Sequence, residues 1–91
     1  MTTYIIERTI PGAGAMNDAA WRGAAGKSNH AIADVGPGLS WVTSYVTDDK
    51  VFCIYEADDT AKIRRHGECG GFPVDAVHQI RRQIDPSTAG S

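Results

Sequence analysis

Hydrophobic and polar residues recur with two different periods along this chain, and glycine, proline and aspartate stand where the period changes. Short runs rich in β-branched and aromatic residues predict strands. The first run ends at Pro11-Gly12, and the middle two are separated only by Asp48-Asp49, which indicates a β-hairpin. The four predicted strands cover residues 3–10, 39–47, 50–57 and about 77–84.

Two segments between these strands have helical spacing, and each is preceded by a residue that favours a helix start. Asn17 can cap a helix over about residues 18–33. Asp58 or Asp59 can cap a second helix over about residues 60–69. The chain therefore contains two predicted helices, one on each side of the hairpin.

The first predicted helix carries one face of apolar and small residues, namely Trp21, Ala24, Ala25, Ser28 and Ile32. Gly23 and Gly26 interrupt it, and each weakens a helix by about 1 kcal/mol relative to alanine. We interpret these two glycines as places where the helix lies close to the sheet.

The order of elements is β-α-β-β-α-β, which predicts the ferredoxin-like split βαβ arrangement. In this α+β fold, a four-stranded antiparallel sheet carries both helices on one face. Residues 1–84 would form a single domain, as expected for 91 residues. Residues 85–91 (DPSTAGS) are expected to be a flexible C-terminal tail.

Neither face of the predicted hairpin is plainly polar. In the second predicted strand, one face carries Trp41, Thr43 and Tyr45, and the other carries Val42, Ser44 and Val46. In the third, one face carries Val51, Cys53 and Tyr55, and the other carries Phe52, Ile54 and Glu56. Two helices cover only one face, and monomers usually avoid a large exposed apolar patch. We therefore predict a homodimer of the dimeric α/β-barrel type, with a cavity between the sheets or beside the second helix.

The register of the hairpin is left open by the sequence. A two-residue loop would place Tyr45 opposite Phe52, whereas a three-residue loop would place Tyr45 opposite Cys53. A slip of one residue exchanges the two faces.

Composition narrows the class of protein. The net charge is −2, and the basic residues are scattered apart from two arginine pairs, which argues against a nucleic-acid-binding surface. Neither a signal peptide nor an apolar run long enough to span a membrane is evident, so we expect a cytoplasmic protein with reduced cysteines and no membrane partner.

His66 and Cys53 are the side chains best suited to bind a transition metal. His66 follows Ile63 by three positions and so lies near the apolar face of its helix; alternatively, it only bonds a carbonyl at the helix end. Cys53 lies in the middle of a strand, where a free cysteine usually packs as a small hydrophobic residue.

Glu56 and Glu7 are further candidates, because a carboxylate in a half-covered sheet needs a partner or a place at the rim. Tyr45 and Tyr55 can donate hydrogen bonds into a cavity and are candidates for ligand binding, although tyrosines more often pack. No Ser-His-Asp order, P-loop or C-x-x-C motif supports an enzyme.

The run from Trp41 to Lys50, its continuation CIYEA at residues 53–57, His66, and the corner Gly71-Phe72-Pro73 together resemble a small bacterial family. The opening YIIER at residues 4–8 fits as well. The chain is similar over about residues 3–84 to the nickel-responsive, nickel-binding proteins of actinobacteria, formerly a domain of unknown function.

This resemblance implies a ferredoxin-like dimer that binds nickel and has no established catalytic activity. The motif positions able to coordinate the metal are His66, Cys53, Glu56 and Glu7. A site with one imidazole and one or two carboxylates would hold nickel weakly, which suits buffering or sensing.

Two other functions remain open at the level of sequence. Ferredoxin-like dimers also house cofactor-free oxygenases and isomerases, in which Tyr45, His66 and Glu56 would be acid–base groups. The chain could equally be a non-catalytic regulatory or interaction subunit, whose polar motif only shapes the dimer.

Overall fold

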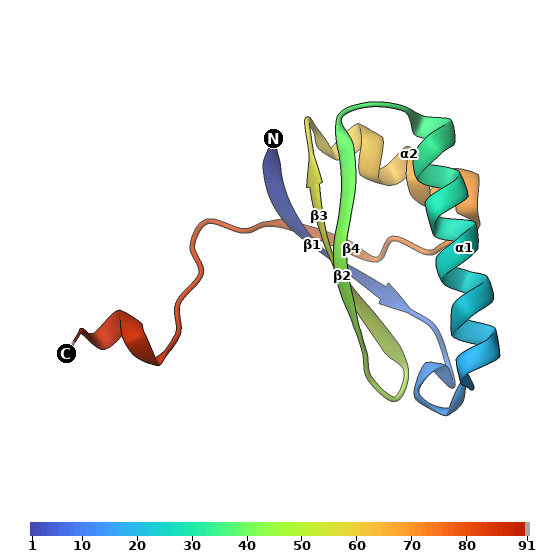
Figure 1. Cartoon of the computed structure of the whole chain (residues 1–91), viewed down its shortest axis with the longest axis horizontal. Helices are drawn as coiled ribbons and strands as arrows, with labels where there is room; N and C mark the ends of the chain where they lie inside the picture. Colours follow the sequence, from blue (N-terminus) through green and yellow to red (C-terminus); the bar gives the residue numbers. More distant parts are fainter. Residues whose placement is uncertain (91) are drawn as a thin grey trace.

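The fold is an antiparallel sheet with two helices packed on one of its faces (Figure 1). A computed structural model describes residues 1–90. The elements are β1 (Thr2–Thr9), η1 (Ala13–Ala15), α1 (Asp18–Val35), β2 (Leu39–Val46), β3 (Lys50–Ala57), α2 (Thr60–Gly70), β4 (Ala76–Gln79) and η2 (Pro86–Ala89). The predicted βαββαβ order is confirmed, and the fold is ferredoxin-like.

The strand order in the sheet is β2-β3-β1-β4, so β1 lies in the interior and pairs with both β3 and β4. Both helices start where the sequence predicts. The Asn17 side chain accepts a hydrogen bond from the Ala20 amide, and the Asp59 side chain accepts one from the Lys62 amide. In Figure 1 the helices lie on one side of the sheet, and the C-terminal segment extends away on the other.

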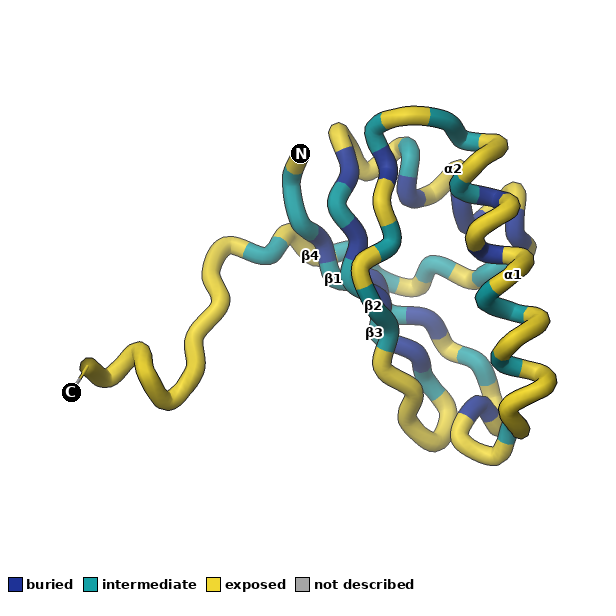
Figure 2. Tube along the Cα trace, viewed as in Figure 1, coloured by how far each residue is buried: buried dark blue, intermediate teal, exposed yellow. Residues whose placement is uncertain are grey.

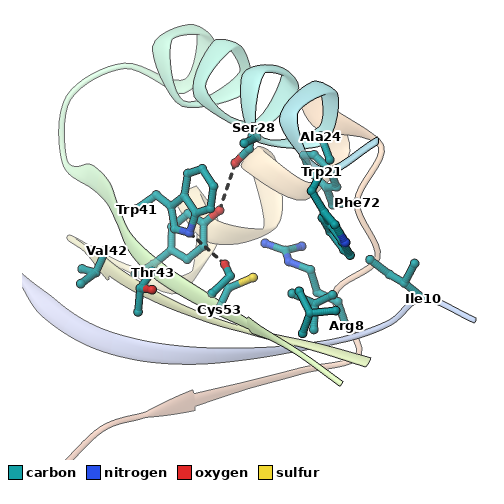
Figure 3. Close-up of a pocket in the computed structure, with 15 residues that line it drawn as sticks. Arg8, Ile10, Trp21, Ala24, Ser28, Trp41, Val42, Thr43, Cys53 and Phe72 are labelled. Atoms are coloured by element: carbon teal, nitrogen blue, oxygen red, sulfur yellow. Dashed lines mark hydrogen bonds between the residues drawn. The ribbon is translucent and has the colours of Figure 1, made fainter. Parts of the chain in front are cut away.

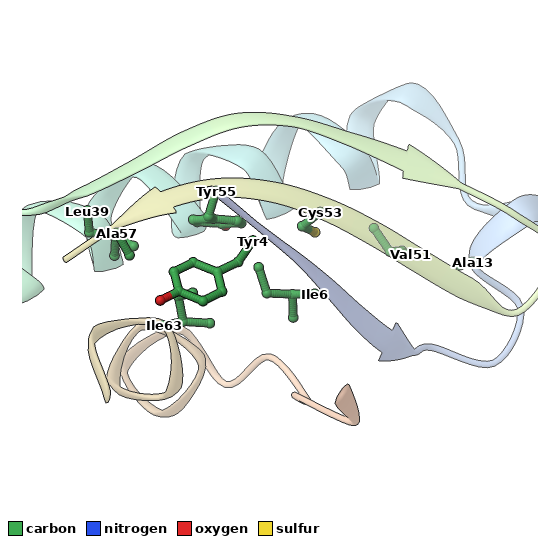
Figure 4. Close-up of a cluster of buried hydrophobic side chains, with 9 residues drawn as sticks. All are labelled: Tyr4, Ile6, Ala13, Leu39, Val51, Cys53, Tyr55, Ala57 and Ile63. Carbon is green, nitrogen blue, oxygen red and sulfur yellow. The ribbon is translucent and has the colours of Figure 1, made fainter. Parts of the chain in front are cut away.

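The core lies between the sheet and the helices (Figures 2 and 4). Every second residue of β3 is buried, beginning with Val51, and the intervening residues are half-buried. β1 has the same alternation. The buried cluster consists of Tyr4, Ile6, Ala13, Leu39, Val51, Cys53, Tyr55, Ala57 and Ile63. This period of two is typical of a sheet with one fully covered face.

The hairpin has the register of the two-residue Asp48-Asp49 loop. Tyr45 pairs with Phe52, and the Thr47 amide donates a hydrogen bond to the Lys50 carbonyl. An irregularity between Trp41 and Thr43 interrupts the ladder. The expectation that Trp41 and Tyr45 share a face is therefore wrong, because the inserted residue turns Trp41 toward the helices.

The last strand is shorter than predicted. β4 ends at Gln79, which pairs with Tyr4, rather than near residue 84. The Ile80 amide still donates to the Thr3 carbonyl, but β1 begins at Thr2 and offers no further partner. The chain then runs exposed into η2, whose cap is Asp85. Ser91 lies outside the described residues.

The glycines at which a helix lies close to another part of the chain are not the two that we predicted. Gly23 and Gly26 are exposed, and a methyl group added at either would meet no atom within 4 Å. By contrast, a Cβ at Gly67 of α2 would lie 2.8 Å from a methyl of Val74 and 2.9 Å from the Phe72 carbonyl oxygen. The small residues that permit tight packing are therefore on α2, not on α1.

Substitution of these glycines should have opposite effects on stability. Gly67→Ala should lower the free energy of unfolding by about 1–3 kcal/mol, because the backbone at Phe72 must move. Gly23→Ala should raise it by up to about 1 kcal/mol, because the exposed helix gains a better helix former. Urea denaturation followed by circular dichroism measures both values, and equal changes in the two variants would contradict this packing.

Candidate functional site

A cavity of about 460 Å³ opens between α1 and the helix-facing side of the sheet (Figure 3). It is mainly apolar. Its lining consists of Arg8, Ile10, Trp21, Ala24, Ala25, Ser28, Trp41, Val42, Thr43, Ser44, Val46, Val51, Cys53, Tyr55 and Phe72. Cavities of this size commonly hold small molecules.

The sequence of α1 explains why space remains there. The part of this helix that faces the cavity carries the small residues Ala24, Ala25 and Ser28, with Trp21 one turn earlier. On the opposite side, the irregularity in β2 directs Trp41 inward, where its indole lies 6.5 Å from the Tyr55 ring and stacks at 17°. The indole Nε1 donates to the Ser44 hydroxyl at 2.9 Å.

Arg8 places a buried positive charge at this cavity. Its position in β1 has the same parity as Tyr4 and Ile6, and only 3% of its surface is exposed. Nη1 donates to the Pro73 carbonyl at 2.8 Å, whereas Nη2 is buried without a hydrogen-bond partner among residues 1–90. The guanidinium carbon lies 5.9 Å from the Tyr55 ring and 5.6 Å from the Phe72 ring, so cation–π attraction offsets part of its desolvation.

His66 lies in a hydrogen-bonded cluster just behind the cavity wall. It is 1% exposed, and its Nε2 lies 3.1 Å from the Ser28 hydroxyl and 3.5 Å from the Tyr55 hydroxyl. Its ring stacks on Phe72 with centroids 5.7 Å apart. Its Nδ1 is buried without a partner in the described chain. His66 is thus held by side chains rather than by a helix-end carbonyl.

The two titratable members of this cluster are held in their neutral forms. Burial, and then the nearby Arg8 charge, lower the pKa of His66 below its ordinary 6.5. Burial raises the pKa of Tyr55 above its ordinary 10.0, which outweighs the opposite effect of its hydrogen bond with Ser28. At neutral pH, Arg8 is therefore the charged group of this region.

Cys53 also faces the helix side. It is 5% exposed, lines the cavity and carries a free thiol, as does the exposed Cys69. Cys53 pairs with Ile6 on one side and Ser44 on the other, which places it in the packed layer under the cavity.

The predicted carboxylates lie on the other face of the sheet, which we call the open face. Glu7 and Glu56 are half-buried there, at strand positions that alternate with the buried residues. Glu7 forms an ion pair with Lys50 at 2.5 Å, and this hydrogen bond and charge raise the pKa of the Lys50 amine. Tyr45 belongs to the same face by its pairing with Phe52 and is 62% exposed.

Within one copy, the predicted site residues form two groups separated by the sheet. His66, Cys53 and Tyr55 lie on the helix side, whereas Glu7, Glu56 and Tyr45 belong to the open face. Among residues 1–90, no group of three or more His, Cys, Asp or Glu side chains is placed to hold a metal ion. The enzyme hypothesis assigned acid–base roles to Tyr45, His66 and Glu56, and these residues are also separated by the sheet. His66 lies on the helix side, whereas Tyr45 and Glu56 belong to the open face.

Sequence reasoning missed the residues that define the cavity, above all Arg8 and Ser28. The signal for Arg8 was present, since it follows Tyr4 and Ile6 at intervals of two on the buried face. Trp41 and Phe72 could not have been placed, because one depends on the irregularity in β2 and the other on the turn after α2.

No helix in the described part of the chain is long and apolar enough to cross a membrane.

Comparison with known proteins agrees with the fold. The model of the SCO4226-like family, described as nickel responsive protein SCO4226-like, matches residues 4–80. A solved structure of SCO4226 from Streptomyces coelicolor A3(2) superposes with a TM-score of 0.75 at 12% identity, covering 90% of this chain and 99% of that one. No curated protein matches the chain.

The lowered pKa of His66 predicts a pH-dependent stability. Below the ordinary value of 6.5, the unfolded chain binds a proton that the folded chain does not, so stability should fall as the pH drops from neutral through 6.5. The decrease in stability should end where the pH reaches the pKa of His66 in the folded protein. Thermal melting across this range measures the effect.

His66→Gln should flatten this slope, because glutamine can still bond Ser28 but does not titrate. His30→Gln is the matched control, since His30 is exposed on α1, and it should keep the slope. An unchanged slope in His66→Gln would assign the pH dependence to other groups.

Proposed function

Because the chain belongs to the SCO4226-like family of nickel responsive proteins, we propose that it is a small non-catalytic protein that binds nickel as a homodimer and buffers or senses it. The observation that carries this proposal is the family match, which spans residues 4–80 of the 91. The free thiols of both cysteines agree with a place in the cytoplasm, where disulfides are rare.

The open face of the sheet supports the dimer. On this face, Ile5 pairs across the sheet with Ile54, and Phe52, two residues earlier in β3, pairs with the exposed Tyr45. Ile5, Phe52 and Ile54 are half-buried in one copy. Both helices pack on the opposite face (Figure 1), so a second copy stacked by a two-fold axis would bury these side chains.

The C-terminal segment gives a second reason for the dimer. Residues 81–90 are exposed throughout and leave the domain on the side of the open face (Figure 1). Ile84 in this segment is 70% exposed. A second copy on the open face would lie beside this segment and could bury its apolar residue.

The open face also suits a divalent cation better than the cavity does. His66 and Cys53 lie beside the Arg8 guanidinium, and a positive charge there would repel nickel. Glu56 brings negative charge to the open face, Glu7 is paired there with Lys50 and would have to exchange this partner for the metal, and His78 of β4 pairs there with Ile5. Carboxylate and imidazole are donors that nickel accepts.

One copy does not bring these donors together. Glu56 pairs with Thr3, so it stands four residues along β1 from Glu7, about 13 Å at the usual rise of a strand. In our proposal the missing ligands of each site come from the second copy, with water completing the shell. Such a site would exchange nickel readily and would depend on the dimer.

The dimer can be tested by sedimentation. The wild-type protein should sediment as a particle of twice the 9.7 kDa chain mass. Ile54→Lys places a charge in the middle of the open face and should give monomers, whereas Ala33→Lys, on the exposed side of α1, should remain dimeric. A monomeric wild-type protein at micromolar concentration would overturn the dimer and the shared metal site with it.

Nickel binding can be tested by calorimetric titration. Glu7→Gln and Glu56→Gln should each weaken binding about tenfold or more, because each removes a charged ligand while keeping a similar shape. Cys53→Ser should bind nickel like the wild-type protein. The reverse pattern, with loss on Cys53→Ser and His66→Gln only, would place the metal on the helix side.

A further inference from the structure

The cavity holds a positive charge that lacks a counterion in the described chain. The ion pairs of residues 1–90 join Lys50 to Glu7 and Lys62 to Asp58, so none of them includes Arg8. An arginine stays protonated in proteins, and burying its charge without an anion is costly. The guanidinium is stabilised by the Pro73 carbonyl and by the rings of Tyr55 and Phe72, and within residues 1–90 its Nη2 has no hydrogen-bond partner.

Arg8 is one of the residues that line the cavity, although almost all of its surface is buried. Figure 3 shows the guanidinium between Trp21, Phe72 and Cys53, pointing from the sheet toward α1. The side chains around it are mainly aromatic and aliphatic, from Ile10 to Trp41. A ligand that fills this cavity therefore meets one cation and an apolar wall.

We propose that this cavity binds a small carboxylic acid with an apolar body, and that its carboxylate accepts a hydrogen bond from the guanidinium of Arg8, which lines the cavity. A carboxylate oxygen is an acceptor suited to the planar guanidinium. The volume of about 460 Å³ suits a body of a medium-length aliphatic chain or a single aromatic ring. Trp21 and Trp41 lie at the cavity and contact that body.

The charge balance selects a monoanion over a phosphate. Arg8 is the single charged side chain in the lining of the cavity within residues 1–90. His66 behind the wall is held neutral, because burial and Arg8 lower its pKa. A phosphate ester would bring up to two negative charges into an apolar space with one cation, so the second charge would be desolvated without compensation.

This inference is independent of the nickel proposal, because the cavity and the carboxylates of the open face lie on opposite sides of the sheet. The experiment is therefore done in metal-free buffer with a chelator. A negative result for the acid would leave the nickel titrations unaffected, and a negative nickel result would leave the acid titration unaffected.

The test compares octanoate with octanamide, which have the same apolar chain but differ in charge. The chain has two tryptophans, and both line the cavity, so their fluorescence reports on occupancy. We expect octanoate to shift the emission and to bind about tenfold or more tightly than octanamide, as a charged hydrogen bond provides. Acetate, which lacks the apolar body, should cause no shift at the same millimolar concentrations.

Two variants locate the binding. Arg8→Gln should abolish the preference for acid over amide, and Arg64→Gln, which changes an exposed arginine, should retain it. Ala25→Leu fills the cavity from α1 without changing Arg8 and should weaken the binding of both ligands. If Arg8→Gln does not fold, the acid and amide comparison on the wild-type protein together with Ala25→Leu still decides the question.

Equal affinity for octanoate and octanamide would overturn the role of Arg8. The absence of any tryptophan response to octanoate would overturn the site itself. Octanoate binding that is unchanged in Ala25→Leu would place the acid outside this cavity and would also contradict the proposal.

Discussion

The alternation of side chains along β1 is the constraint on which the rest of this protein depends. β1 lies in the interior of the sheet and pairs with two strands, so each of its residues is committed to one face. Glu7 and Arg8 are consecutive, and their opposite charges therefore lie on opposite sides. The acid is available to the open face, and the base is buried beneath the helices. A shift of the register by one residue would exchange the two charges and would also move Tyr4 and Ile6 out of the core, so hydrophobic burial fixes the pairing.

The sequence was sufficient for features that local chemistry controls. The βαββαβ order, the helix start at Asn17 and the hairpin around Asp48-Asp49 follow from capping, turn and periodicity rules. The choice between Asp58 and Asp59 as a cap and the register of the hairpin were left open, and the structure selects Asp59 and the two-residue loop. The end of β4 was not predictable in this way, because it depends on where β1 begins. The faces of β2 were also out of reach, since one extra residue near Val42 reverses the parity of Trp41.

The same limit of local sequence applies to the candidate residues of the site. His66 and Cys53, which the sequence made candidates for binding a metal, are both buried, and their neighbours decide their chemistry. Ser28 comes from α1, and Arg8 comes from β1, so neither is near His66 in the sequence. The buried Arg8 cation favours an anionic or apolar ligand over a metal cation at this place. Spacing within one motif does not contain this information, because these residues come from four separate elements.

The irregularity in β2 has a consequence for how copies of this protein meet. β2 and β4 are the two edges of the sheet, and edges are where strands of different molecules can join into fibrils. β4 has four residues, and β2 is distorted near Val42, so neither edge presents a long regular template. Both features discourage open-ended, edge-to-edge growth into amyloid. In the dimer that we propose, the two copies would instead stack through the open face of the sheet, and this stacking would close after two copies.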